Sequence, residues 1–131
     1  MTAGTTAGLT LDTGALLALD HPAKFLVMQA RLDEALRRGG TLCIPVGVIA
    51  QAWRSPRQVR LARLLKSRDV DVAVMTPNTA RAVGLVCART GHDDVIDVHV
   101  AMCARERNHA VVTSDPGDLS RIDPDLPLIK A

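Results

Sequence analysis

The chain has 131 residues, of which 47% are hydrophobic, and a formal net charge of +2. This length and apolar fraction predict one compact domain over residues 9–131, preceded by a flexible tail over residues 1–8. Phe25 and Trp53 are the only aromatic residues. The composition therefore argues against a protein that stacks single-stranded nucleic acid on aromatic side chains.

The sequence also indicates the cellular compartment in which we expect the protein. Residues 1–8 are small and polar and lack the basic-then-apolar pattern of a secretion signal. No apolar run approaches the roughly 20 residues that cross a membrane. Cys43, Cys87 and Cys103 lie in apolar runs without a Cys-x-x-Cys pair, which predicts buried thiols in a reducing compartment and no zinc site. We therefore expect a cytoplasmic protein that does not associate with a membrane.

Short apolar runs typical of strands alternate along the chain with longer runs of helical spacing. In chain order the expected elements are a strand at 9–11, helices at 13–19 and 23–38, a strand at 41–44, helices at 46–54 and 57–66, a strand at 70–75, helices at 78–90 and 94–107, and strands at 110–113 and 126–129. This alternation predicts an α/β fold in which helices cover both faces of a mainly parallel sheet. In such sheets the functional site lies beyond the carboxyl ends of the strands.

Two acidic residues follow predicted strands and are candidates for such a site. Asp12 follows the first strand, and Asp115 follows the strand at 110–113. Each also has a purely structural explanation, since Asp12 precedes Thr13-Gly14 and Asp115 precedes a proline, and both positions suit a helix N-cap. Asp94, or its neighbour Asp93, is in the same way placed to cap the helix at 94–107.

Asp97 is the acid that capping explains least well. It lies in a helix whose neighbouring residues are apolar all round, which predicts a central helix and a partly buried carboxylate. An unpaired buried carboxylate is costly. Asp94 and Asp97 are spaced i, i+3 and share a helix face. We therefore predict an acidic pocket formed by Asp12, Asp97 and Asp115, with Asp94 beside it.

Several carboxylates close together repel one another unless a cation lies among them. Hard oxygen ligands favour Mg²⁺ or Mn²⁺, whereas His92, His99 and His109 lack the spacing or the cysteine partner expected of a zinc site. A cation held in this way can activate water and neutralise charge on a phosphodiester. The sequence therefore predicts Asp12, Asp97 and Asp115 as metal ligands and, with Asp94, as catalytic residues.

The middle of the chain carries only basic charges between Gln51 and Arg68. In this basic stripe Arg54, Arg57, Arg60 and Arg63 recur at every third position. A solvated helix face is the simple interpretation, but such faces usually mix both signs of charge. Binding of these four arginines to an RNA backbone, or to an acidic partner, is the alternative hypothesis.

Four motifs taken in order resemble those of the PIN-domain ribonucleases, specifically toxins of the VapC type in VapBC toxin–antitoxin systems. They are LDTGAL at 11–16, IPVGVIAQAWR at 44–54, DVIDVHVA at 94–101 and VTSDP at 112–116. The resemblance spans residues 9–129. It implies a Rossmann-like PIN domain, an α/β/α sandwich with Mg²⁺- or Mn²⁺-dependent endoribonuclease activity. It also implies a homodimer and neutralisation by a cognate antitoxin protein.

The resemblance assigns the family's acids residue by residue. The first acid matches Asp12, the third matches Asp97 with Asp94 as a close neighbour, and the fourth matches Asp115, with Asp118 assisting. These assignments agree with the acids singled out from the sequence pattern.

The chain departs from the family at the second acid. The family has a glutamate in the helix after the second strand, where this chain has Gln51. Glutamine keeps an oxygen ligand but loses the charge. Two functions therefore stay open: a metal-dependent endoribonuclease toxin, and a PIN-fold module with an impaired metal site that binds RNA or an antitoxin.

Overall fold

Five parallel strands form the centre of the protein, which a computed structural model describes over residues 8–131. Their order across the sheet is β3-β2-β1-β4-β5. The bounds are β1 Gly8–Leu11, β2 Thr41–Pro45, β3 Val70–Ala73, β4 Ala110–Thr113 and β5 Leu128–Lys130. The chain moves outward from β1 to β3 and then returns to the other side of β1. The topological switch therefore lies between β1 and β4.

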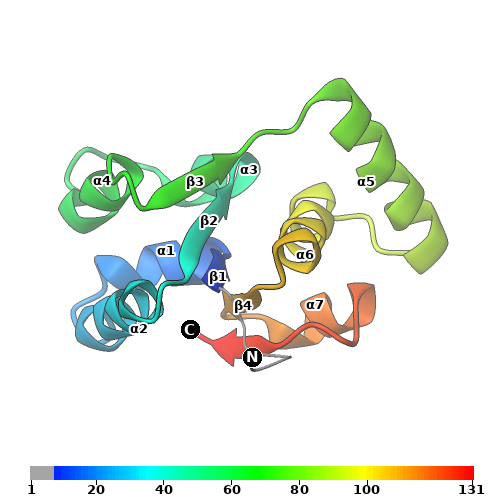
Figure 1. Cartoon of the computed structure of the whole chain (residues 1–131). Helices are drawn as coiled ribbons and strands as arrows, with labels where there is room; N and C mark the ends of the chain where they lie inside the picture. Colours follow the sequence, from blue (N-terminus) through cyan, green and yellow to red (C-terminus); the bar gives the residue numbers. More distant parts are fainter. Residues whose placement is uncertain (1–7) are drawn as a thin grey trace.

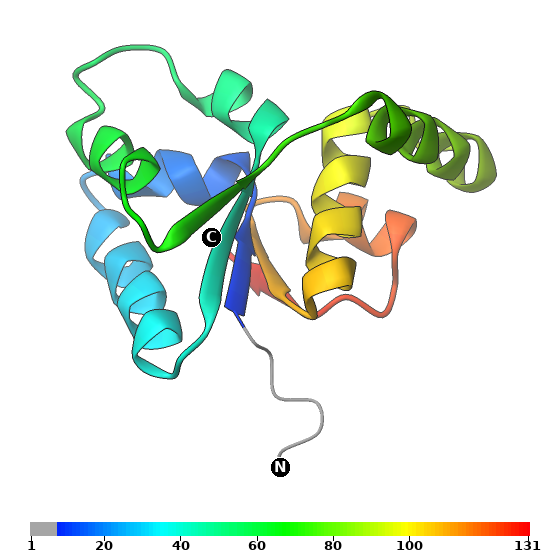
Figure 2. The ribbon, with the colours of Figure 1, turned by 45° about the horizontal axis from the view of Figure 1, so that its top comes forward.

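Helices cover both faces of this sheet, and their bounds are α1 Thr13–Leu19, α2 Phe25–Arg37, α3 Val46–Ala52, α4 Val59–Leu65, α5 Pro77–Thr90, α6 Val95–Arg107 and α7 Pro116–Ile122. Helices α1, α2 and α4 lie on one face, and α6 lies on the other with α5 and α7 beside it (Figures 1 and 2). The predicted α/β/α sandwich is thus confirmed. Every predicted strand and helix is present, with ends shifted by up to two residues.

Three local differences separate the structure from the sequence prediction. Helix α7 was not predicted, although the Asp115-Pro116 start signal was recognised. Strand β5 begins at Leu128 rather than at residue 126. Gly8, assigned to the tail, is the first residue of β1, where it pairs with Thr41. The remainder of the predicted tail, residues 1–7, lies outside the described residues.

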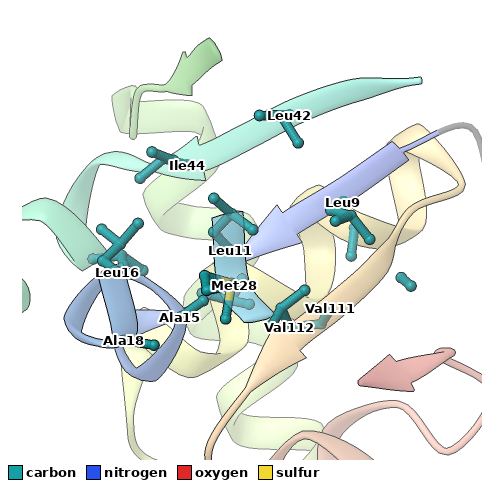
Figure 3. Packing of buried hydrophobic residues seen from close by; sticks show 14 of the residues in the cluster. Leu9, Leu11, Ala15, Leu16, Ala18, Met28, Leu42, Ile44, Val111 and Val112 are labelled. Atoms are coloured by element: carbon teal, nitrogen blue, oxygen red, sulfur yellow. The ribbon is translucent and has the colours of Figure 1, made fainter. Parts of the chain in front are cut away.

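The core lies between the sheet and the helices on either side, and apolar strand residues form its centre (Figure 3). Leu11, Ile44 and Val112 are almost fully buried, as expected for strands covered on both faces. Helix α6 is the central helix that the sequence predicted, since Val98, Val100 and other residues around its circumference are buried.

Two thiols, Cys43 and Cys103, are buried as predicted, whereas Cys87 on α5 is only half-buried. The exposure of Cys87 follows from the position of α5, which packs mainly against α6 and leaves its other side to solvent. In the described part of the chain, no helix is both long and apolar enough to cross a bilayer.

Candidate functional site

Asp12 follows β1 at the topological switch and is 7% exposed. Its carboxylate caps α1, because Oδ1 accepts a 2.8 Å hydrogen bond from the Thr13 amide. Its other oxygen, Oδ2, accepts a 2.8 Å hydrogen bond from the Thr113 hydroxyl at the end of β4. Asp12 therefore caps α1 as the sequence suggested, but the cap uses only one of its two carboxylate oxygens.

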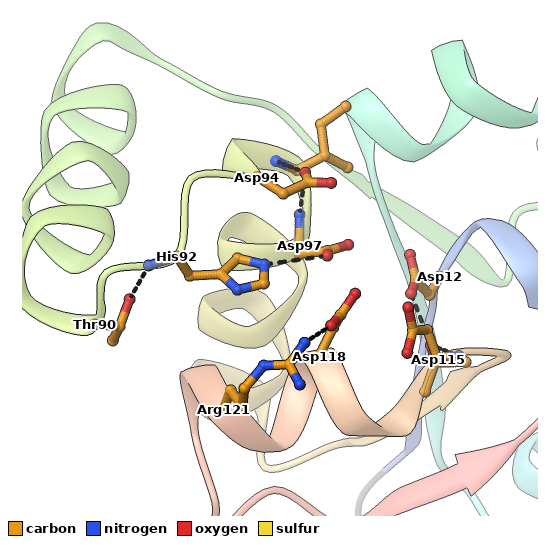
Figure 4. A network of polar contacts seen from close by, with 10 residues as sticks. Asp12, Thr90, His92, Asp94, Asp97, Asp115, Asp118 and Arg121 are labelled. Carbon is orange, nitrogen blue, oxygen red and sulfur yellow. Dashed lines mark hydrogen bonds and ion pairs between the residues drawn. The ribbon is translucent and has the colours of Figure 1, made fainter.

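Asp115 lies beside Asp12, on the segment that follows β4. Its backbone amide donates a 3.0 Å hydrogen bond to Thr113 Oγ1, the same hydroxyl that binds Asp12. Asp115 occupies the N-cap position of α7, but its side chain makes no capping hydrogen bond and is exposed. The capping explanation therefore does not account for this carboxylate, which points toward the same space as that of Asp12 (Figure 4).

A glycine allows these two turns to approach each other. A Cβ atom placed on Gly14, in the first turn of α1, would lie 2.2 Å from Ser114 Oγ and 2.6 Å from Ser114 Cβ. No side chain larger than hydrogen fits this space without movement of the β4–α7 turn. Gly14 thus permits Asp12 and Asp115 to be neighbours.

Asp94 and Asp97 face this pair from the start of α6 (Figure 4). Asp94 is the N-cap of α6, where Oδ1 accepts hydrogen bonds from the amides of Ile96 at 3.0 Å and Asp97 at 3.1 Å. The Asp97 side chain is 16% exposed, and its Oδ2 lies 3.3 Å from His92 Nε2, which donates to it. The partial burial predicted for Asp97 is confirmed, and Asp94 has the predicted capping role.

The pKa of Asp97 depends on its burial and on the neighbouring acids. Burial raises the pKa of the Asp97 carboxyl, and the charges of Asp94 and then Asp12 raise it further. The hydrogen bond and charge of His92 lower that pKa and offset only part of the increase. Asp97 is therefore a carboxylate that the fold holds in an unfavourable environment, which is typical of a functional site.

Gln51 and Asp118 also belong to this region. The Thr13 hydroxyl donates to Oε1 of Gln51 on α3, so the glutamine side chain reaches the residue next to Asp12. Asp118, on the first turn of α7, forms an ion pair with Arg121 and points toward the acids (Figure 4). His92 also belongs to this site through its contact with Asp97, a role that the sequence pattern did not indicate.

The structure does not bring the acids into direct coordination distance of one common point. Within residues 8–131, no group of three or more His, Cys, Asp or Glu side chains is close enough to hold a metal ion. Asp12 and Asp115 are neighbours, Asp94 and Asp97 are neighbours, and the two pairs face each other across the carboxyl edge of the sheet.

The four arginines of the basic stripe differ in what they contact. Arg60 lies over the Phe25 ring, 3.9 Å from its centroid, and its Nη1 is 4.0 Å from Asp20 Oδ1. Arg54 donates through Nη1 to the carbonyl oxygens of Ala50 and Trp53. All four arginines are exposed. The contacts of Arg54 and Arg60 support local structure, so Arg57 and Arg63 are the better candidates for binding a partner.

One cavity, of about 520 Å³, lies away from these acids. It is lined by Gly8 and Leu9 of β1 and Ala110 of β4, so it opens at the amino ends of the strands, opposite the acidic edge. The cavity therefore does not adjoin the acids, which lie at the carboxyl edge of the sheet beside the switch point.

No family model matches the sequence, and no curated protein matches it. Among solved structures, a chain of "Structure of FitAB bound to IR36 DNA fragment" aligns with a TM-score of 0.63 over 93% of this chain and 94% of its own length. The chain has a PIN-like fold. At 16% identity the similarity concerns the fold alone, and it confirms the predicted fold class.

Proposed function

We propose that this chain is the toxin component of a type II toxin–antitoxin system and acts as a Mg²⁺- or Mn²⁺-dependent endoribonuclease. The observation that carries the proposal is the position of Asp12 and Asp115 at the switch point of a PIN-like sheet, facing an Asp97 whose pKa is raised. Acids gathered at such a point suit hydrolysis of a phosphodiester assisted by a cation.

The donor atoms fit a hydrated divalent cation. All four acids offer carboxylate oxygens, which are the ligands that Mg²⁺ and Mn²⁺ prefer. Because no three of the described side chains converge on one point, the arrangement suits an ion held by one or two carboxylates that keeps several of its waters. Asp12, Asp97 and Asp115 would hold it, one or two of them directly and the remainder through the waters that the ion keeps. Such an ion would supply an activated water and neutralise charge on the phosphodiester.

The protein side chains would orient these ligands. The Thr13 amide and the Thr113 hydroxyl fix both oxygens of Asp12. His92 holds one oxygen of Asp97, and Asp94 fixes the start of the helix that carries Asp97. Hydrogen bonds of this kind set the direction of a metal-binding carboxylate. Arg57 and Arg63, which are exposed, would bind phosphates of the RNA strand.

The proposal includes a cognate antitoxin, a homodimer and a cytoplasmic location, where RNA is available. The likeness to a chain of FitAB, a structure solved bound to a DNA fragment, supports a macromolecular partner for a chain of this fold.

RNA cleavage tests the proposal. We expect the purified protein to cut RNA with Mg²⁺ or Mn²⁺ and to stop when EDTA is added, and Asp97→Asn to lower the rate about 100-fold or more. Asp93→Asn is the matched control, since Asp93 is an exposed acid in the same run. Equal rates for wild type and Asp97→Asn would reject the mechanism.

Gln51 supports a second candidate, a PIN-fold module with an impaired site that binds RNA or an antitoxin. Its amide oxygen accepts from Thr13 beside Asp12, at the position where the resemblance expects a glutamate. Gln51→Glu distinguishes the candidates. A rise from near-zero cleavage to rapid cleavage would show that the natural chain works by binding, whereas a small change would favour the nuclease.

A further inference from the structure

The cavity of about 520 Å³ at the amino ends of the strands, which we call the α2 groove, has a lining that the proposed function does not use. Apart from Gly8, its lining consists of six apolar residues and three charged ones. The apolar residues are Leu9, Val27, Ala30, Ala35, Ala110 and Ile129. Small-molecule sites commonly have volumes of about 300–1,000 Å³, mostly apolar walls and a few placed polar groups. The α2 groove has all three properties.

Helices and strands, rather than loops, form the α2 groove. Its wall is one face of α2, since the lining residues from Val27 to Arg38 recur at intervals of three or four positions. Its floor is the sheet, where Leu9 of β1 and Ala110 of β4 are register partners in neighbouring strands. Alanines at three of the lining positions leave the space between wall and floor unfilled. The groove is therefore part of the folded framework.

Within residues 8–131, Arg31 is the charged lining residue with which no acid forms an ion pair. Its Nη1 donates a 2.7 Å hydrogen bond to the backbone carbonyl oxygen of Lys130, which ties the guanidinium on α2 to β5. Glu34 is paired with Arg37 and Arg38. The charge that the groove offers a ligand is therefore positive, and a guanidinium binds a carboxylate particularly well.

The apolar part of the α2 groove is open to water. Val27 is 57% exposed, and Ile129 is half-buried. Covering such a surface with hydrocarbon is favourable. A polyanion such as RNA would leave the apolar wall wet, and an aliphatic cation would place its charge beside Arg31. A ligand with one anionic group and one hydrocarbon chain suits both parts of the groove.

We propose that the α2 groove binds a free aliphatic monocarboxylate of medium chain length. Its carboxylate accepts hydrogen bonds from Arg31, and its chain lies between Val27 and the floor formed by Leu9 and Ala110. The groove is at the opposite edge of the sheet from Asp12, so this inference does not depend on nuclease activity. A ligand that binds only the folded chain stabilises it.

Calorimetric titration of the full-length protein with hexanoate, octanoate and decanoate, each below its micelle concentration, tests the inference. The Kd should fall about tenfold for every two methylene groups added. Octanol and octylammonium carry a neutral and a positive head on the same chain, and each should bind at least about tenfold more weakly than octanoate. Octanoate should also raise the Tm saturably, whereas an unspecific surfactant effect would lower it.

Two variants and a matched control locate the binding site. Arg31→Gln should weaken octanoate binding about tenfold and leave the weaker binding of octanol unchanged. Ala30→Trp places a large side chain in the groove at an exposed position and should weaken the binding of both ligands. Arg89→Gln removes an exposed arginine of α5 and should bind octanoate as the wild type does.

Three results would reject the inference: no saturable binding of octanoate, equal affinities for octanol and octanoate, or the same loss of affinity in Arg89→Gln as in Arg31→Gln. Binding of anionic phospholipid vesicles without binding of free octanoate would also reject it, because the groove would then meet a membrane surface. The comparison of head groups uses the wild type, so it stays decisive even if a variant fails to fold.

Discussion

The Thr113 hydroxyl donates a 2.8 Å hydrogen bond to Oδ2 of Asp12, across 101 positions of sequence. The same hydroxyl oxygen accepts a hydrogen bond from the Asp115 amide. One fully buried side chain therefore orients the acid after β1 and the backbone of the acid after β4. The Thr113 hydroxyl thus holds together the Asp12–Asp115 pair of the acidic edge.

Thr113→Val keeps the shape of the side chain and removes the hydroxyl. We expect a loss of about 1–3 kcal/mol in the free energy of unfolding, because the buried Asp12 loses a donor and the Asp115 amide loses its acceptor. Urea denaturation measures this loss. Thr113→Ser retains the hydroxyl and should be much closer to wild type. If the serine variant is as unstable as the valine variant, packing of the methyl group explains the effect instead.

Gly14→Ala should destabilise the protein by about 1–3 kcal/mol, since the new Cβ would overlap Ser114 Oγ and Cβ. Ser114→Gly removes those two atoms, so the double variant should recover part of the loss. Thermal unfolding of the two single variants and the double variant gives the coupling between the sites. Strict additivity would show that the clash with Ser114 is not the cause.

Stability should depend on pH through Asp97. Because its pKa is raised in the folded state, the folded chain holds this proton to higher pH than the unfolded chain does. The contribution of Asp97 is therefore most favourable below the ordinary aspartate pKa of about 3.9, and it is lost as pH rises through the folded-state pKa. Without metal, Asp97→Asn should be more stable than wild type at pH 7, and the difference should shrink toward pH 4.

The same variant tests cation binding without any activity assay. Added Mg²⁺ should raise the Tm of wild type more than that of Asp97→Asn, because bound cation relieves repulsion only where the carboxylates remain. Asp93→Asn should respond to Mg²⁺ as wild type does. An equal Mg²⁺ response in all three proteins would place the cation elsewhere.

The basic stripe should divide into structural and binding residues. Arg60→Gln should lower the stability by up to about 1 kcal/mol, because it loses the contacts with Phe25 and Asp20. Arg63→Gln should leave stability unchanged but weaken RNA binding and flatten its salt dependence. Filter binding at several salt concentrations measures this. If RNA binding is unchanged in both variants, the stripe is not the RNA contact.

The acids could be found from sequence because a simple rule of geometry governs them. Parallel strands end at one edge, so Asp12 and Asp115 were expected at the same edge, and the pairing of β1 with β4 makes them neighbours. Asp97 stood out because an acid within an apolar helix needs an explanation. Helix α7 was missed since it is short, contains Gly117 in its first turn and has only Leu119 buried.

Contacts between elements that are distant in the sequence could not be predicted from the sequence pattern. Spacing every third residue suggested one uniform basic surface, but it does not show that Phe25 lies under Arg60. The grouping of Cys43, Ala73 and Cys103 in one small buried cluster depends on how α6 crosses the sheet. The role of His92 depends on the path of the loop before α6. Each of these is a tertiary contact without a local signal.

The strand order also bears on synthesis of the protein. β1, first of the strands to be made, pairs with β4, which is among the last. Asp12 therefore cannot contact Thr113 and Asp115 until nearly the whole chain has left the ribosome. A truncated or unfinished chain contains the first acid but not its partners, so a partial translation product carries no assembled acidic edge.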